Sequence, residues 1–317
     1  MFKENKKKLF HLLSIFVILI FSCVLFFPQL NGSKVEAGDM VSSDAKSKHI
    51  KEYMQNNNDL IYWNAAQFSG GPIYLLALGK KNNIMGYIDK AITFNHAAPI
   101  GLFFALGLFL YISLIFLNID WKLSLVLSLV HMVSLMNFTL LEAGHYSKLY
   151  TLAYLPLILS GIIQTFKNRF ISGGIFVAIG MSLAIYSGHV QMVYYLGISI
   201  AFFLIPLLIK SIRATNKSNL LKIIPILLVA LLFGVLSNFS QLYSSLKFSE
   251  KTMRGGDVLE QEASPENKVG LDWEYAMNWS YTTKDFFNII VPRIVGGGSQ
   301  ENISSENPLA KLLIQNG

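Results

Sequence analysis

Residues 170–209 read FISGGIFVAIGMSLAIYSGHVQMVYYLGISIAFFLIPLLI and contain no Asp, Glu, Lys or Arg. A helix that crosses a bilayer needs about 20 consecutive apolar residues, so this stretch is long enough for two helices that turn near Gly188 and His189. The whole chain is 53% hydrophobic and 14% charged, whereas a soluble domain has roughly 25% charged residues. The sequence therefore predicts an all-α integral membrane protein. It offers about seven transmembrane helices, at residues 9–27, 97–117, 123–141, 149–166, 170–187, 190–209 and 223–243.

The charges of the short loops predict the orientation of these helices, because cytoplasmic loops carry an excess of Lys and Arg. Placing the N-terminus in the cytoplasm puts every short basic loop on that side. The basic residues concerned are Lys3, Lys6, Lys7, Lys8, Lys122, Lys167, Arg169, Lys210, Arg213, Lys217 and Lys222. The net charge of +7 is thereby explained by topology, and we expect no nucleic-acid partner. The single cysteine, Cys23, excludes an intramolecular disulfide.

The predicted topology divides the chain into four segments. Residues 1–27 form a basic cytoplasmic N-terminus and the first transmembrane helix. We expect this helix to be retained as a signal anchor, because its apolar run exceeds the roughly 7–15 residues of a cleaved signal. Residues 28–96 form a long first external loop, and residues 97–243 hold the remaining transmembrane helices with short loops. Residues 244–317 form an external segment that we expect to be truncated, so that the chain is the N-terminal portion of a longer protein.

The long external loop is expected to carry surface helices. Ser42 or Ser43 can cap a helix, with Asp44 near its N-terminus. The residues that recur on one face of this helix are Ala45, His49, Ile50, Tyr53 and Met54. Such an amphipathic helix would lie on the membrane surface. Further along, residues 62–63 are typical of an interfacial aromatic anchor, 69–72 of a turn, and 82–95 of a connector back to the membrane.

Polar side chains gather in the loops of the predicted outer face. They are Asp39 and Asp44 in the long loop, Glu142, His145 and Lys148 after the third apolar run, His189 and Gln191 after the fifth, and Arg254 after the last. Acid, imidazole and cationic groups at one membrane surface are typical of a site that handles a phosphate-bearing lipid. Each can also be an ordinary solvated loop residue. His131 lies within an apolar run, and we expect it to hydrogen-bond a neighbouring helix rather than to relay protons.

The order of several motifs resembles the YfhO-like membrane proteins of bacteria. The motifs are FPQLNG at 27–32, GD at 38–39, WN at 63–64, FSGGP at 68–72, EAGHYSK at 142–148, GHVQMVYY at 188–195 and MRG at 253–255. YfhO-like proteins are similar to polytopic GT-C glycosyltransferases, but they continue through further spans and a C-terminal external domain. The resemblance covers most of the chain. It implies a multi-pass enzyme of the bacterial cytoplasmic membrane that moves a sugar from a polyprenyl-phosphate donor to an envelope glycan or polymer outside.

The resemblance also implies roles for the loop residues. GT-C enzymes use an acidic residue of the first external loop at the catalytic centre, which places Asp39 there, with Asp44 as the alternative. The residues then expected to bind the donor phosphate are Glu142, His145, Lys148, His189, Gln191 and Arg254. A carboxylate can accept the proton of the attacking hydroxyl, and cations can offset the charge of the leaving lipid phosphate. A divalent metal held by Asp39 and Glu142 can do the same, and two carboxylates do not decide whether one is used.

Two other functions remain open from the sequence. A transporter or flippase usually has ionisable residues or broken helices near the membrane midplane, and the predicted spans contain no Asp, Glu, Lys or Arg. A non-catalytic envelope assembly protein would use the external loops to bind partners. Replacing Asp39 by Asn would leave an assembly role intact, whereas a transferase would lose turnover and keep its fold.

Overall fold

The computed structural model describes residues 2–35, 37–57, 61–65, 70–73, 83–95, 98–213 and 217–249, and after these 252, 273–278, 280–291, 294–295, 304, 311 and 314–315. The chain divides into two units, Met1–Leu246 and Lys247–Gly317. The helices of the first unit are α1 (Phe2–Leu25), α2 (Phe27–Leu30), α3 (Gly38–Asn57), α4 (Ile84–Ile92), α5 (Ile100–Phe116), α6 (Trp121–Met132), α7 (Leu135–Glu142), α8 (Tyr146–Phe166), α9 (Phe170–Tyr186), α10 (Val190–Arg213) and α11 (Lys217–Leu236). Helix α12 (Phe239–Ser249) crosses the boundary between the units, and the second unit contains α13 (Trp273–Met277) and a 3-10 helix (Thr283–Ile289).

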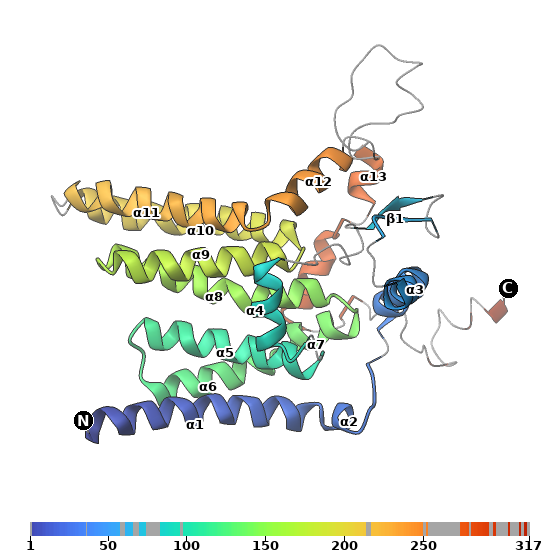
Figure 1. The fold of residues 1–317 in the computed structure, drawn as a ribbon, viewed down its shortest axis with the longest axis horizontal. Helices are drawn as coiled ribbons and strands as arrows, with labels where there is room; N and C mark the ends of the chain where they lie inside the picture. The colour runs from blue at the N-terminus through green and yellow to red at the C-terminus, as the bar shows by residue number, and fades with distance from the viewer. Residues whose placement is uncertain are drawn as a thin grey trace, which may run out of the picture. The chain divides into compact units, whose positions relative to one another are not determined.

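The first unit is a bundle of long apolar helices that lie side by side (Figure 1). Within the described residues, 5 helical segments are long and apolar enough to cross a membrane: Asn5–Leu25, Trp121–Glu142, Tyr146–Phe166, Val190–Arg213 and Asn219–Leu236. Helices α5 and α9 are also apolar but have 17 residues each. The prediction of a helical, multi-pass membrane protein is therefore confirmed.

Glycines allow the most extensive helix contact of the bundle, between α8 and α9. A Cβ atom at Gly161 would lie 2.7 Å from the carbonyl oxygen of Gly173 and 2.8 Å from the backbone nitrogen of Val177. On its other side α9 contacts α11, where a Cβ atom at Gly234 would lie 2.5 Å from Cβ of Met181. Small residues let helices approach closely in a membrane. Helix α9 is therefore held between α8 and α11, while α5 packs against α8 and α6.

The two ends of the bundle differ in composition. Arg169 donates a hydrogen bond to Asn118 at 3.3 Å, and Asn219 donates one to Asn168 at 2.7 Å. These bonds join the turns before α6 and α9 to the start of α11, and we call this the basic end. The turns that precede α8 and follow α9 lie at the opposite end, together with α2, α3 and α4 (Figure 1). We call it the loop end.

Side-chain amides hold the backbone where helices begin or break. Gln29 of α2 donates to the carbonyl of Ala98 at 2.8 Å and accepts from the backbone N–H of Ile100 at 3.0 Å, which ties α2 to the start of α5. The third predicted span is interrupted between α6 and α7, where Asn137 donates to the carbonyl of His131 at 2.7 Å. Where a helix breaks inside a membrane, the backbone carbonyls that lose their helical partners need other hydrogen-bond donors.

Two predictions about the spans need correction. The last span was expected to run through 223–243, but α11 ends at Leu236 and α12 begins at Phe239. Asn238 lies at the break, and its side-chain amide donates to the carbonyl of Ser182 on α9 at 2.9 Å. The expected helix-to-helix hydrogen bond of His131 is not found either: its Nε2 is buried without a partner among the described residues.

The segment 28–96 contains helices α2, α3 and α4, as expected. On the predicted apolar face of α3, Ile50 is buried and the exposed fraction of Tyr53 is 43%. The placement of α3 on a membrane surface stays a prediction. Trp63–Asn64 (β1) pairs antiparallel with Gly71–Pro72 (β2), so the predicted anchor and turn belong to one short ribbon. A Cβ atom at Gly70 would lie 2.5 Å from Nε1 of Trp63, and its φ of 122° also favours glycine.

Replacing Gly161 by Val tests the glycine contact. The added side chain must push α9 away from α8, because backbone atoms cannot yield as a flexible side chain does. We expect the free energy of unfolding to fall by about 1–3 kcal/mol, seen as a lower SDS concentration at the unfolding midpoint. Gly197→Ala is the control, because nothing lies within 4 Å of a Cβ atom there. Equal midpoints for the two variants would contradict the contact.

Candidate functional site

Asp39, His145 and Lys148 form a chain of contacts at the loop end. Oδ2 of Asp39 lies 3.2 Å from Nε2 of His145, and Nζ of Lys148 lies 3.3 Å from Nδ1 of the same ring. An ammonium group can only donate, so Nδ1 accepts and Nε2 carries the proton that faces the carboxylate. The side chain of Asp39 is 67% exposed and that of His145 is 37% exposed. The carboxylate is therefore open to a molecule that arrives from solvent.

The turn between α7 and α8 brings these side chains together. Gly144 has a φ of 80°, a left-handed conformation that suits glycine, and it ends α7 while α8 starts at Tyr146. A Cβ atom at Gly144 would lie 3.1 Å from Cβ of Asp39 and 3.1 Å from Cβ of Ala37. The backbone of the turn is thus packed against the first turn of α3. Asp39 consequently comes within reach of the next residue of the turn, His145.

The two aspartates of α3 have different surroundings. The prediction that Ser42 or Ser43 caps this helix is wrong, because α3 begins at Gly38. Asp39 therefore lies in the first turn, where the helix dipole stabilises a negative charge. Asp44 lies in the helix interior and forms an exposed ion pair with Lys51 at 2.6 Å. No described contact joins Asp44 to His145 or Lys148.

His189 lies beside the positive part of this group, in the turn between α9 and α10. Burial lowers the pKa of His189 below its ordinary value, and the charge of Lys148 lowers this pKa further. Its Nδ1 is buried and has no hydrogen-bond partner among the described residues. The ring is therefore mainly neutral near pH 7. We call Asp39, His145, Lys148 and His189 the polar cluster.

The other predicted site residues are not joined to the polar cluster by described contacts. Gln191 donates to the hydroxyl of Tyr195 at 2.6 Å, one helical turn further along α10. Glu142 is exposed at the end of α7. Arg254 lies outside the described residues. In the described part of the chain, no three His, Cys, Asp or Glu side chains come together in an arrangement that could hold a metal ion.

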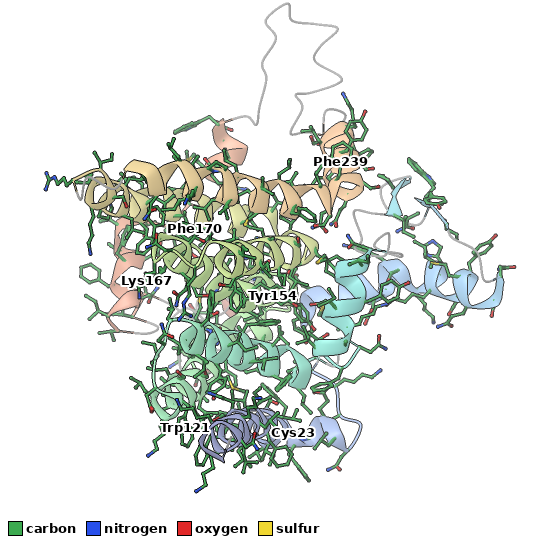
Figure 2. All side chains as sticks on the ribbon, turned by 60° about the vertical axis from the view of Figure 1, so that its left-hand side comes forward. Cys23, Trp121, Tyr154, Lys167, Phe170 and Phe239 are labelled. Carbon is green, nitrogen blue, oxygen red and sulfur yellow. The ribbon has the colours of Figure 1, made fainter. Side chains whose placement is uncertain are left out.

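A buried carboxylate, Asp89, was missed in the sequence. It lies on α4 with an exposed fraction of 3%, and the hydroxyl of Tyr154 on α8 donates a hydrogen bond to it. Figure 2 shows Tyr154 inside the bundle. Tyr186, the last residue of α9, packs against the same helix, because its hydroxyl lies 2.6 Å from where a Cβ atom of Gly86 would be. Asp89 and Gly86 thus attach α4 to α8 and α9.

Helix α4 exposes large apolar side chains and buries a carboxylate. Its apolar residues Ile84 and Tyr87 are 68% and 63% exposed, whereas Asp89 is buried. Asn83 caps the helix through Met85 N–H at 2.8 Å and donates to Oδ1 of Asn238 at 3.0 Å. Exposed apolar side chains on a helix with a buried carboxylate fit a helix that is embedded at the edge of a membrane. The lone Asp in the sequence IMGYIDKAI was the signal that could have indicated it.

Comparison with known proteins gives no relative: no family model, no curated protein and no solved structure matches the chain. Helix length and hydropathy show a helical multi-pass membrane protein. Any assignment of function rests on the chemistry of the polar cluster.

Replacing Lys148 by Gln is expected to raise the pKa of His189 towards its ordinary value, because a neighbouring positive charge disfavours the imidazolium. Titration of 15N-histidine-labelled protein by NMR in nanodiscs measures this. In the wild type, the depressed pKa stabilises the fold above about pH 6.5, the pKa of an unfolded chain, and this contribution declines as the pH falls below that value. Lys51→Gln is the control. If the pKa of His189 is the same in Lys148→Gln as in the wild type, the side chains of Lys148 and His189 do not lie close enough to interact.

Replacing Tyr154 by Phe is expected to loosen α4, because it removes the hydroxyl that donates to Asp89. A hydrogen bond to a charged group contributes about 1.5–3 kcal/mol, so amide hydrogen exchange in residues 84–92 should become about tenfold faster or more. Tyr87→Phe on the exposed face of α4 serves as the matched control. If both variants exchange like the wild type, the Asp89 contact does not hold the helix.

Proposed function

We propose that the protein is a membrane glycosyltransferase of the GT-C type. It would move a sugar from a polyprenyl-phosphate donor to an envelope acceptor on the outer face of a bacterial cytoplasmic membrane. The polar cluster is the observation that carries this proposal, because it sets an exposed carboxylate beside an imidazole and an ammonium group. With α5 and α9 included, the first unit would have about seven spans, and the basic end would face the cytoplasm.

The proposed reaction uses Asp39 as the general base. The oxygen of an acceptor hydroxyl attacks the anomeric carbon of the donor sugar, and the hydroxyl proton passes to Asp39. The bond between the anomeric carbon and the phosphate oxygen breaks, and the electron pair leaves with the lipid phosphate. A carboxylate that is 67% exposed is accessible to the acceptor, and its contact with His145 orients it.

The cationic side of the cluster would bind the leaving phosphate. Lys148 supplies a positive charge close to the imidazoles of His145 and His189. Charge-assisted hydrogen bonds of this kind strengthen as negative charge develops. Gln191 and Glu142 lie near the same two turns, and with Arg254 they remain proposed contributors to donor binding.

The proposal is tested by comparing Asp39→Asn with Asp44→Asn, two aspartates of the same helix. Membranes that carry each variant receive a radiolabelled polyprenyl-phosphate hexose, and the label that leaves the lipid fraction is measured. We expect Asp39→Asn to lower the transfer rate about 100-fold or more, the usual contribution of a general base. Asp44→Asn should transfer like the wild type, because its carboxylate pairs with Lys51.

Two outcomes would contradict the proposal. Equal transfer rates for the wild type and Asp39→Asn would show that Asp39 is not the general base. An absence of transfer by the wild type with several donor sugars would show that the protein does not catalyse this reaction.

A transporter is the second candidate, and the break between α6 and α7 favours it, because discontinuous helices form substrate sites in many carriers. Against it, the amide of Asn137 occupies the carbonyl of His131 at the break. Uptake of lipid-linked sugar into sealed vesicles would identify a carrier, since a transferase moves no substrate across the bilayer.

A further inference from the structure

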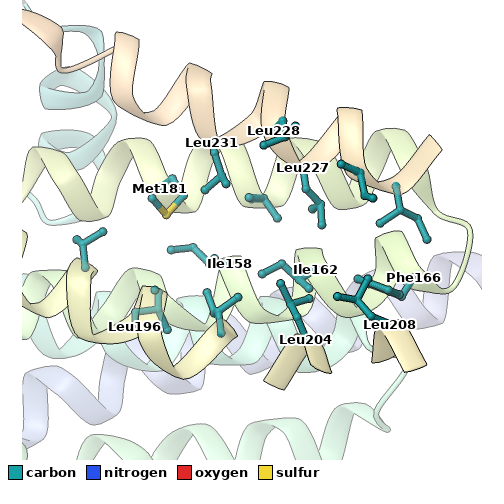
Figure 3. Close-up of a pocket in the computed structure, with 16 residues that line it drawn as sticks. Ile158, Ile162, Phe166, Met181, Leu196, Leu204, Leu208, Leu227, Leu228 and Leu231 are labelled. Atoms are coloured by element: carbon teal, nitrogen blue, oxygen red, sulfur yellow. The ribbon is translucent and has the colours of Figure 1, made fainter. Parts of the chain in front are cut away.

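Apolar side chains line a cavity between α8, α9, α10 and α11. Its volume is about 350 Å³, and Figure 3 shows the 16 lining residues, all of which are apolar. Along α10 the lining extends from Val193 to Leu208, about 22 Å at 1.5 Å per residue. This length exceeds half the roughly 30 Å thickness of a bilayer's hydrocarbon core. The cavity is therefore long enough for a hydrocarbon chain from one leaflet.

The cavity opens sideways to the bilayer. Two of its lining residues on α11, Ile224 and Leu228, are 49% and 59% exposed. Gly197 on α10 also lines it, and nothing lies within 4 Å of the position of a Cβ atom there. A lipid chain can thus enter between α10 and α11 without crossing a polar surface.

At the basic end the lining includes Phe166, the last residue of α8, together with Leu208 on α10 and Ile223 on α11. At the other end, its α8 part begins only at Ile158, ten residues after Lys148. The lysines that adjoin the lining are therefore those of the basic end.

Three lysines lie within two residues of lining residues at the basic end. Lys167 follows Phe166 directly, Lys222 precedes the lining residue Ile223, and Lys210 lies two residues after Leu208. Nζ of Lys222 lies 6.0 Å from the ring centroid of Phe170, and Figure 2 labels Lys167 and Phe170 at this end. All three lysines are exposed, so their ammonium groups are free to meet a headgroup at the membrane surface.

We propose that this cavity binds one acyl chain of an anionic phospholipid, with Lys167, Lys210 and Lys222 holding its phosphate. Basic pockets between transmembrane helices on the cytoplasmic side are suited to anionic headgroups. The site is separate from the polar cluster and does not depend on the proposed transfer reaction. Topology alone explains the lysines, but it does not explain an apolar cavity that ends among them.

Photolabelling of the full chain in nanodiscs tests the proposal. The probe is phosphatidylglycerol with a diazirine near the end of one acyl chain, and the comparison is phosphatidylcholine with the same chain. Labelled peptides are identified by mass spectrometry. We expect phosphatidylglycerol to label the lining residues of α10 and α11 about tenfold more than phosphatidylcholine does. Equal labelling by the two probes would overturn the headgroup assignment.

Variants locate the chain and the headgroup separately. Gly197→Phe should fill the cavity and abolish labelling of its lining, whereas Ile198→Phe, at a residue that is 42% exposed and outside the lining, should not. Replacing Lys167, Lys210 and Lys222 by Gln should remove the preference for phosphatidylglycerol. The matched control replaces three other basic residues, Lys6, Lys7 and Lys8, by Gln and should keep it.

Two further results would overturn the proposal. One is labelling confined to the outer surface of α10, for example at the exposed Phe202, unaffected by Gly197→Phe. The other is displacement of the probe by polyprenyl phosphate that depends on Lys148 instead of on the three lysines of the basic end. That result would assign the cavity to a lipid whose headgroup lies at the loop end. It would support the proposed function and overturn the phospholipid proposal.

Discussion

The contact between α8 and α9 is the interaction on which the rest of the first unit depends. Gly161 and Gly173 let the two backbones meet, and the helices run in opposite directions, joined by the short turn at residues 167–169. The start of α8 and the end of α9 therefore lie at the same end of the bundle. His145 and Lys148 come just before or at the start of α8, and His189 comes just after α9. One packing contact thus brings residues from two separate turns into one cluster.

The same contact creates the place where α4 is attached. Tyr154 on α8 holds Asp89, and Tyr186 on α9 contacts Gly86. Asn238 adds a third connection by joining the carbonyl of Ser182 to Asn83. Polar side chains in an apolar interior need partners, and here each bond also fixes a segment that the bundle must hold in place. Helix α4 is therefore anchored from within the bundle, next to the turns that carry the polar cluster.

The sequence predicted the long helices well, because runs such as 170–187 and 190–209 leave no other way to satisfy the backbone in lipid. It also predicted which short turns carry polar residues, since Gly144-His145 and Gly188-His189 interrupt those runs. The periodicity of the sequence could not predict that Asp39 contacts His145, because the contact depends on how α3 packs against Gly144. The resemblance to a family singled out both residues, but it gave no distance between them.

Other features had no signal strong enough to read. The helix start at Gly38 was missed, because Ser42 and Ser43 looked like better caps than glycine. Asp89 was overlooked since a single acidic residue in a loop of mixed composition is usually solvated. The breaks in the third and last predicted spans lie at Asn137 and Asn238, whose side-chain amides donate to backbone carbonyls. Tertiary packing determines these partners, and no local sequence pattern encodes it.

The position of α3 on the turn between α7 and α8 is the central claim, and cysteine cross-linking measures it most directly. In a Cys23→Ser background, Asp39→Cys with Gly144→Cys places two Cβ atoms about 3.1 Å apart, close to the 3.5–4.5 Å of a disulfide. Asp44→Cys with Gly144→Cys carries the same strain at Gly144 and serves as the control. The structure predicts that mild oxidation of membranes cross-links the first pair and not the second. Equal cross-linking of both pairs, or of neither, would contradict the placement of Asp39 beside His145.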